Sequence, residues 1–239
     1  METKKLFIIK TGEAFPAVVD ELGDFEDWIA KGLGQGSDDV QVVNAEYQHP
    51  LPEIRAVKGA VIAGSHAMVT QNLDWSMKIE AWIPKLIQAE IPLLGICYGH
   101  QIIARAMGGK VDFHPKGIEI GTTDIECLNS GDKDPLFQDL PRIFKAHVSH
   151  SQTITKLPES AVVMAKNIFE PHHAYRIGNA AWGVQFHPEY DIAIMKTDIK
   201  NMSQAINTSG QDLALLLDRV EDTPIASMVL RRFGALVSR

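Results

Sequence analysis

The sequence has little of what marks several large protein classes. Its two cysteines, Cys97 and Cys127, cannot build a disulfide framework in 239 residues, and a reducing cytoplasm suits them best. No apolar run approaches the ~20 residues that cross a bilayer, and no cleavage pattern follows Met1–Lys5. The 23 Lys and Arg are scattered among 30 Asp and Glu, which disfavours nucleic acid as a partner. We therefore expect a cytoplasmic globular protein without membrane segments, acting on a small molecule.

Hydrophobic residues, at 45%, suffice for one core, and their pattern in the first half indicates an α/β fold. Apolar runs typical of buried strands alternate with stretches of helical spacing, which predicts βαβ units and a mainly parallel sheet. The expected strands are 6–9, 40–43, 60–63 and 92–96. Helical spacing begins after Asp74, a plausible N-cap, contains an irregular Pro84, and recurs from Gln101 to Met107.

The second half adds elements beside this parallel core. Residues alternate in polarity over 117–122 and 181–186, which predicts strands with one wetter face. Helical patterns then follow at 192–206, 213–220 and 225–237. With no repeats or linkers, we expect a single domain over 1–239, with a core of about 5–190 and C-terminal helices over 191–239.

One glycine-rich segment, Gly32–Gly36, superficially suggests a dinucleotide-binding loop. It follows a helical pattern rather than a strand, and its spacing departs from the phosphate-binding fingerprint. We interpret it as a helix C-cap and loop.

Gly95-Ile96-Cys97-Tyr98-Gly99 carries the strongest chemical signal. It lies where a buried strand turns into a helix and follows the G-x-nucleophile-x-G pattern, with cysteine in place of serine. Such a turn exposes the thiol at a helix N-terminus, where unpaired N–H groups favour a thiolate. The alternative is a buried structural cysteine, which is our interpretation of Cys127.

A nucleophilic cysteine needs an imidazole, and His187 is the best candidate among nine histidines. It follows a predicted strand and precedes Pro188, which keeps it extended, so its side chain and that of Glu189 project to one face. His100 competes, but it lies on the helix that follows Cys97 and should face the pocket wall or neighbouring elements. A metal site is disfavoured because no matching ligand pattern accompanies the remaining histidines, which include His147, His150, His172 and His173.

Taken together, Gly95-Ile-Cys-Tyr-Gly-His-Gln101 and Gly183-Val-Gln-Phe-His-Pro-Glu189 resemble the class I glutamine amidotransferase family. The resemblance runs from about Val61 to Glu189. It implies a flavodoxin-like α/β domain, an open and mostly parallel sheet with helices on both faces. It also implies hydrolysis of the γ-amide of glutamine by a Cys-His-Glu triad, with no metal or organic cofactor.

The resemblance implies a role for each matching residue. Cys97 would be the nucleophile, His187 the general base and acid, and Glu189 the residue that orients it. An oxyanion hole would be formed by backbone donors of Gly64, Ser65 and Tyr98. The amino-acid end of the substrate would be held by Gln101 and by the segment containing Ser149, His150 and Gln152. Acyl transfer would proceed through a γ-glutamyl thioester.

Two departures from the family pattern bear on the substrate. Gly64-Ser65-His66 stands where Gly-Gly-Pro is usual, and Gln152 stands where an aspartate often meets the substrate ammonium. A neutral amide holds an ammonium more weakly than a carboxylate does. The chain thereby resembles the stand-alone branch of the family, which includes γ-glutamyl peptidases as well as GMP synthase amidotransferase domains.

Three functions follow from these observations. The first is a glutaminase-type amidotransferase that releases ammonia to solution or to a separate synthetase subunit, since the chain has no phosphate-binding loop of its own. The second is a γ-glutamyl peptidase that cleaves a γ-glutamyl amide in a larger molecule. The third, a non-catalytic binding scaffold, is disfavoured by the intact Cys97, His187 and Glu189.

Overall fold

A computed structural model describes residues 4–34 and 40–239 and contains a nine-stranded sheet in the order β2-β1-β3-β4-β11-β10-β9-β6-β7. One half is parallel: β2 (Val40–Asn44), β1 (Lys5–Lys10), β3 (Val57–Ile62), β4 (Leu93–Ile96) and β11 (Ala181–Val184). The other half is antiparallel: β10 (Ala174–Ile177), β9 (Ala161–Lys166), β6 (Glu119–Cys127) and β7 (Ile143–His150). A separate two-stranded sheet pairs β5 (Lys110–Phe113) with β8 (Gln152–Lys156).

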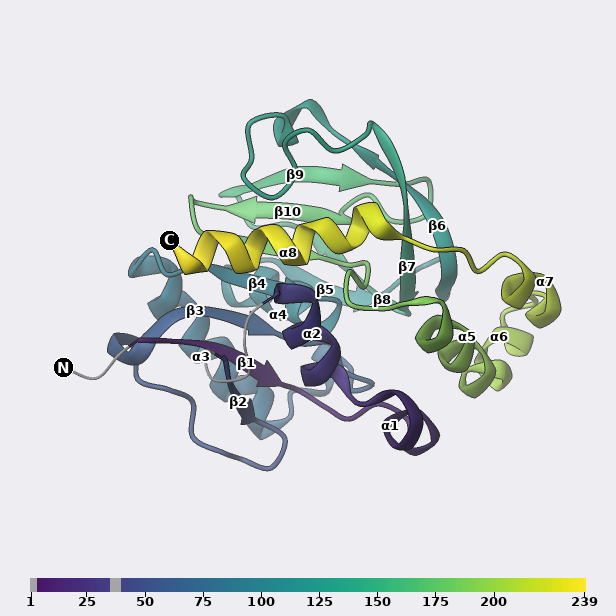
Figure 1. Cartoon of the computed structure of the whole chain (residues 1–239), viewed down its shortest axis with the longest axis horizontal. Helices are drawn as coiled ribbons and strands as arrows, with labels where there is room; N and C mark the ends of the chain where they lie inside the picture. The colour runs from purple at the N-terminus through teal and green to yellow at the C-terminus, as the bar shows by residue number, and fades with distance from the viewer. Residues whose placement is uncertain (1–3, 35–39) are drawn as a thin grey trace.

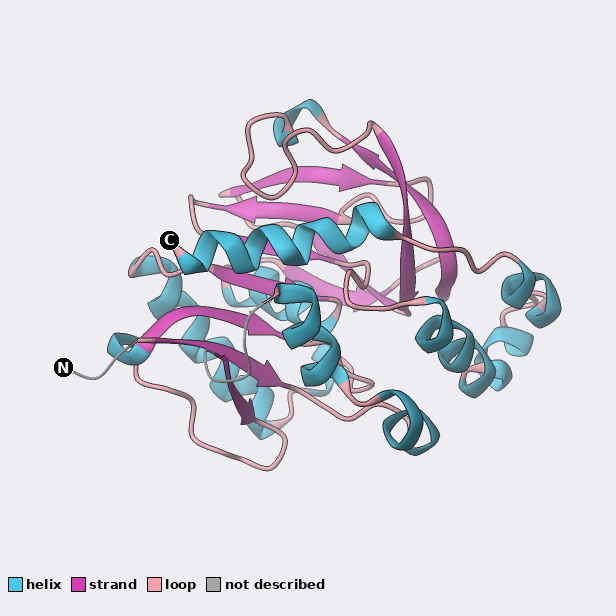
Figure 2. Cartoon of the chain, viewed as in Figure 1, coloured by secondary structure: helices cyan, strands magenta, loops and turns pink. Residues whose placement is uncertain are grey.

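Helices cover both faces of the parallel half (Figures 1 and 2). On one face lie α2 (Phe25–Leu33) and the long α8 (Pro224–Ser238), and on the other α3 (Asp74–Gln88) and α4 (Tyr98–Ala106). Successive residues of β1 point to opposite faces, so Leu6 and Ile8 join one hydrophobic core while Phe7 and Ile9 join the other. The predicted flavodoxin-like α/β class is confirmed, with four antiparallel strands beside the parallel core.

The remaining helices lie towards the carboxyl ends of the parallel strands. After β1 comes α1 (Pro16–Leu22), and after β11 come α5 (Ile192–Asn201), α6 (Ser203–Thr208) and α7 (Leu213–Asp218), which cluster beside β6 (Figure 1). Short 3₁₀ turns occupy Ile54–Ala56, Val69–Gln71 and Asn129–Gly131. None of the helices in residues 4–34 and 40–239 has both the length and the apolar character needed to cross a bilayer.

Several boundaries differ from the sequence-based expectation. Asp74 is the first residue of α3 rather than its N-cap, and α3 continues through Pro84. The helix predicted over 192–206 is two helices, because α5 ends at Asn201 and α6 begins at Ser203. Gly34 caps α2 in a left-handed conformation (φ 66°), as expected, whereas Gln35 and Gly36 lie outside the described residues. The single-domain organisation over 1–239 stays a prediction.

Candidate active site

Cys97 stands on a sharp turn between β4 and α4. Its φ is 48°, a conformation that costs a residue with a side chain about 1–3 kcal/mol. The flanking glycines make the turn possible. A Cβ on Gly95 would lie 2.3 Å from the backbone of Gly99, and a Cβ on Gly99 would lie 2.2 Å from the carbonyl oxygen of Ile62. The motif therefore seats the thiol at the first turn of α4, where helical N–H groups lack intrahelical acceptors.

His187 follows β11 and lies beside Cys97. Its Nδ1 is 2.8 Å from Oε1 of Glu189, and its side chain is within hydrogen-bonding reach of the thiol. Burial lowers the pKa of His187, but the charges of Glu189 and Cys97 raise it by a larger amount. The pKa of His187 therefore lies well above the ordinary value. The ring also stacks on Tyr190 at a centroid distance of 4.1 Å. A buried imidazole held in this way can exchange a proton with the sulfur and with an amide nitrogen bound there.

The loop after β3 approaches the same point. The Thr11 hydroxyl lies 3.1 Å from the carbonyl oxygen of Ala63 and 2.8 Å from that of Gly64. Gly64 lies close to both catalytic candidates: a Cβ on it would be 3.1 Å from the His187 ring and 3.8 Å from the Cβ of Cys97. The backbone of Gly64 and Ser65 thus borders the thiol on one side, while the N-terminus of α4, at Tyr98, borders it on another.

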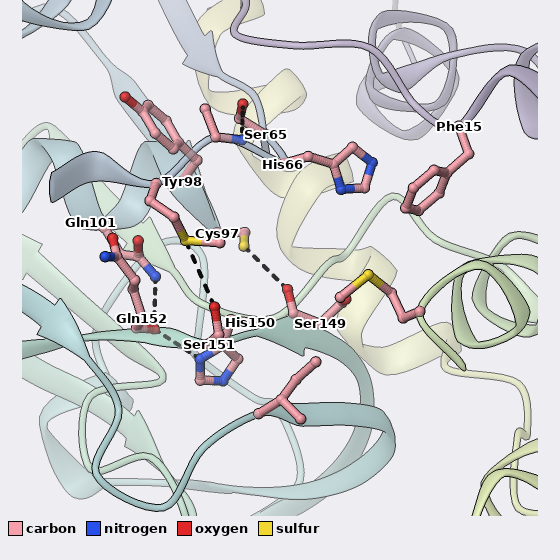
Figure 3. A pocket seen from close by; sticks show the side chains of 14 residues that line it. Phe15, Ser65, His66, Cys97, Tyr98, Gln101, Ser149, His150, Ser151 and Gln152 are labelled. Carbon is pink, nitrogen blue, oxygen red and sulfur yellow. Dashed lines mark hydrogen bonds between the residues drawn. The ribbon is translucent and has the colours of Figure 1, made fainter. Parts of the chain in front are cut away.

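A cavity of about 270 Å³ opens beside Cys97 (Figure 3). At one end lie Gln101 and Gln152. The Nε2 of Gln101 donates to the carbonyl oxygen of Gln152 and to Oε1 of Gln185, both at 2.9 Å. The Nε2 of Gln152 donates to Oγ1 of Thr70 at 2.7 Å, and its buried Oε1 has no hydrogen-bond partner among the described residues. This end therefore offers oxygen acceptors to a polar ligand.

The segment Ser149–His150 forms the floor of the cavity through its backbone. The carbonyl oxygen of Ser149 is 3.6 Å from Sγ of Cys97. The His150 ring is buried and makes its hydrogen bonds away from the thiol, with Nε2 2.8 Å from Oε2 of Glu119. Both residues predicted for substrate contact thus line the cavity, but the His150 imidazole is bonded within the protein.

The opposite end of the cavity was not predicted from the sequence. His66 packs its ring on Phe15 at a centroid distance of 4.3 Å (Figure 3). Met202 also lines the cavity. Near His66, Asp198 of α5 is buried, and its Oδ2 has no hydrogen-bond partner within the described part of the chain. Asp198 follows Ile194 by four residues and lies on the same buried face of α5. An acidic residue on the apolar face of a helix is the sequence signal from which this buried carboxylate could have been predicted.

Two other predictions concern residues outside the cavity. His100 is fully buried against Tyr175 at a centroid distance of 4.8 Å, and burial lowers its pKa well below the ordinary value. It faces neighbouring elements, as expected. Cys127 is a free, buried thiol whose pKa burial raises to about 11, so it stays protonated at neutral pH.

Comparison with solved structures supports the fold assignment. A glutamine amidotransferase of Thermotoga maritima superposes with a TM-score of 0.77 at 20% identity, over 99% of this chain and 98% of that one. A glutamine amidotransferase of Methylobacillus flagellatus superposes with a TM-score of 0.73 at 20% identity, over 100% and 93%.

Sequence comparison points to the same group. The GMP synthase [glutamine-hydrolyzing] of Aeropyrum pernix is 32% identical over 173 residues, which is 72% of this chain and 32% of that protein. Gamma-glutamyl peptidase 4 of Arabidopsis thaliana is 31% identical over 164 residues, 68% of this chain and 65% of the peptidase. The chain thus spans about a third of one relative and under two thirds of the other. Residues 17–203 match the profile of "Glutamine amidotransferase class-I". The chain therefore belongs to the class I glutamine amidotransferase family.

Proposed function

We propose that this chain is a cysteine-dependent amidohydrolase that cleaves the γ-amide of glutamine through a γ-glutamyl thioester. The observation that carries the proposal is the juxtaposition of three side chains beside the cavity, which Cys97 lines. Cys97 projects from the strained turn, within reach of His187, which is bonded to Glu189 at 2.8 Å. Nucleophile, base and orienting carboxylate in this order are the arrangement that acyl transfer requires.

The mechanism follows from these positions. The Cys97 thiolate attacks the γ-carbonyl carbon, and the oxyanion is held by backbone N–H groups of Tyr98 and of Ser65 or Gly64. His187 gives a proton to the departing nitrogen, so that ammonia leaves and the γ-glutamyl thioester remains. His187 then takes a proton from a water molecule that attacks the thioester carbonyl carbon. Glutamate is released, and the Cys97 thiolate and protonated His187 are restored.

The substrate's α-ammonium and α-carboxylate lie at the end of the cavity formed by Gln101, Gln152 and the backbone of Ser149 and His150. Gln152 lines the cavity and its buried Oε1 has no partner among the described residues, which supports this orientation because the α-ammonium could donate a hydrogen bond to it. The scissile amide then lies over Cys97.

The released ammonia goes either to solution or to a separate synthetase subunit. The second route is supported by the similarity to the GMP synthase [glutamine-hydrolyzing] of Aeropyrum pernix. We also propose a cytoplasmic location, because Cys97 and Cys127 are both free thiols.

A second candidate function is a γ-glutamyl peptidase, which uses the same chemistry on a larger leaving group. It is favoured by the wall of Phe15, His66 and Met202 at the end of the cavity opposite Gln101. An amine that carries an apolar group would pack there as it leaves. The similarity to gamma-glutamyl peptidase 4 of Arabidopsis thaliana supports this candidate as well.

One assay separates the two candidates: ammonia and glutamate release from L-glutamine, beside amine release from γ-glutamyl dipeptides. Turnover of glutamine that is lost in Cys97→Ala supports the amidohydrolase, and turnover of dipeptides alone supports the peptidase. Cys127→Ala is the matched control and is expected to retain activity, since that thiol is buried elsewhere. Absence of turnover of every γ-glutamyl substrate contradicts both.

A further inference from the structure

A buried polar network lies behind the end of the cavity that contains Gln101. Glu119 at the start of β6 pairs in register with His150 at the end of β7, and Oε2 of Glu119 is 2.8 Å from Nε2 of His150. Asn167 donates to the other carboxylate oxygen at 2.6 Å, and Nε2 of His173 lies 3.3 Å from Oε2. Glu119 and His150 are both nine-tenths or more buried.

The hydrogen bonds of His150 determine its charge. Nε2 faces the carboxylate of Glu119, and Nδ1 lies 3.0 Å from the carbonyl oxygen of Gln152. Burial raises the pKa of Glu119, but its hydrogen bonds to His150 and His173 lower it by more, to well below the ordinary value, so Glu119 is ionised and only accepts. A carbonyl oxygen also only accepts. Both ring nitrogens of His150 thus face oxygens that only accept, an arrangement that an imidazolium satisfies and a neutral ring does not.

Two neighbouring imidazoles, those of His100 and His114, are disfavoured as sites for this proton. Burial lowers the pKa of His100 well below the ordinary value, and it also lowers the pKa of His114. The titratable groups that face His150 from the surrounding elements are Glu119, His173, His100 and His114, with Glu170 and His172 close to the latter two.

One carbonyl group, that of Gln152, connects His150 with the residues that line the cavity. The carbonyl oxygen of Gln152 accepts from His150 and also from Nε2 of Gln101. The second hydrogen on that Nε2 goes to Oε1 of Gln185. With both amide hydrogens of Gln101 occupied, its Oε1 is the atom left to meet a ligand in the cavity.

We propose that Glu119 is a positioning residue for substrate binding: its charge keeps His150 protonated, and His150 fixes the Gln152 carbonyl that orients Gln101. This inference rests on the proposed function, in which Gln101 meets the amino-acid end of a γ-glutamyl substrate. Glu119 itself touches no reacting atom. Its removal therefore weakens substrate binding and leaves the chemical step intact.

The test compares Glu119→Gln with Glu126→Gln, a control on the same strand whose carboxylate pairs with Arg142 near the surface. We expect KM for L-glutamine or a γ-glutamyl dipeptide to rise about tenfold in Glu119→Gln, because a charge-assisted hydrogen bond becomes a neutral one. The kcat value and the rate of Cys97 alkylation by iodoacetamide should change less than twofold. The control should match the wild type in all three.

Two kinetic results overturn the inference: an unchanged KM in Glu119→Gln, or a parallel fall in kcat and alkylation rate, which marks a merely structural role. Ring-nitrogen NMR of ¹⁵N-histidine-labelled protein at pH 7, assigned with His150→Gln, tests the charge without any substrate. The expected signal is an imidazolium in the wild type that is lost in Glu119→Gln, and a neutral His150 in the wild type refutes the network. A wild type inert on all γ-glutamyl substrates refutes the proposed function, and the NMR result then decides the network separately.

Discussion

The pairing of Glu189 with His187 gives the sharpest quantitative prediction for the proposed chemistry. Glu189→Gln keeps the shape of the side chain but removes the charge that, against the effect of burial, raises the pKa of His187 most. A hydrogen bond to a charged group contributes about 1.5–3 kcal/mol. At ~1.4 kcal/mol per factor of ten, its loss in the transition state lowers kcat by roughly 10- to 150-fold.

The sign of the pH effect follows from the same pair. With Glu189 neutralised, the pKa of His187 falls, so less of the imidazolium persists beside Cys97 at neutral pH. Alkylation of Cys97 by iodoacetamide between pH 6 and 8 should therefore slow, and the midpoint of its pH profile should move.

The assay is steady-state amide hydrolysis with alkylation kinetics on the same preparations, and Glu159→Gln serves as an exposed control. A Glu189→Gln enzyme with wild-type kcat and an unshifted alkylation profile would refute the assignment of Glu189 as the orienting carboxylate. A loss of folding, detected by circular dichroism, would require Glu189→Asp in its place, with a smaller loss of kcat expected.

Three further predictions address packing, specificity and stability. Gly95→Ala is expected to destabilise the fold by about 3 kcal/mol, because its Cβ would meet the Gly99 backbone at 2.3 Å, and urea unfolding measures this. Gln152→Asp is expected to lower KM for a γ-glutamyl substrate about tenfold by offering a carboxylate to the α-ammonium, and an unchanged KM would place that ammonium elsewhere. Burial raises the pKa of Asp198, so the stability linked to its protonation is present at acidic pH and lost as pH rises through the raised value. Asp198→Asn should thus have a Tm roughly 2–4 °C above that of the wild type at pH 7, and this difference should disappear near pH 4. An equal difference in Tm at both pH values would contradict the prediction.

The turn at Cys97 was predictable because its determinants are local. Gly95 and Gly99 flank the cysteine in sequence, and the clashes that a Cβ would create there involve Gly99 itself and the adjacent strand. The proximity of His187 to Glu189 is likewise a matter of two residues in an extended segment, and the structure gives a hydrogen bond of 2.8 Å. The parallel half of the sheet was predictable for a related reason, since buried parallel strands appear as short continuous apolar runs.

The contacts that shape the rest of the cavity depend on distant pairings. Glu119 meets His150 only because β6 and β7 pair in a register that places them opposite each other. The strands β7, β9 and β10 of the antiparallel half were not anticipated, because strands of four to eight residues with irregular burial along their length leave a weak periodic signal. Asp198, which lies near His66, belongs to α5, a helix that follows the matched motifs in the sequence.

The central claim is that Cys97 forms a covalent γ-glutamyl intermediate. The most direct test is rapid acid quenching of the enzyme during turnover of L-glutamine or a γ-glutamyl dipeptide, followed by peptide mass spectrometry. The expected result is a γ-glutamyl adduct on the peptide that contains Cys97, none on the peptide that contains Cys127, and neither adduct nor turnover in Cys97→Ala. Turnover that persists in Cys97→Ala, or an adduct on another residue, would contradict it.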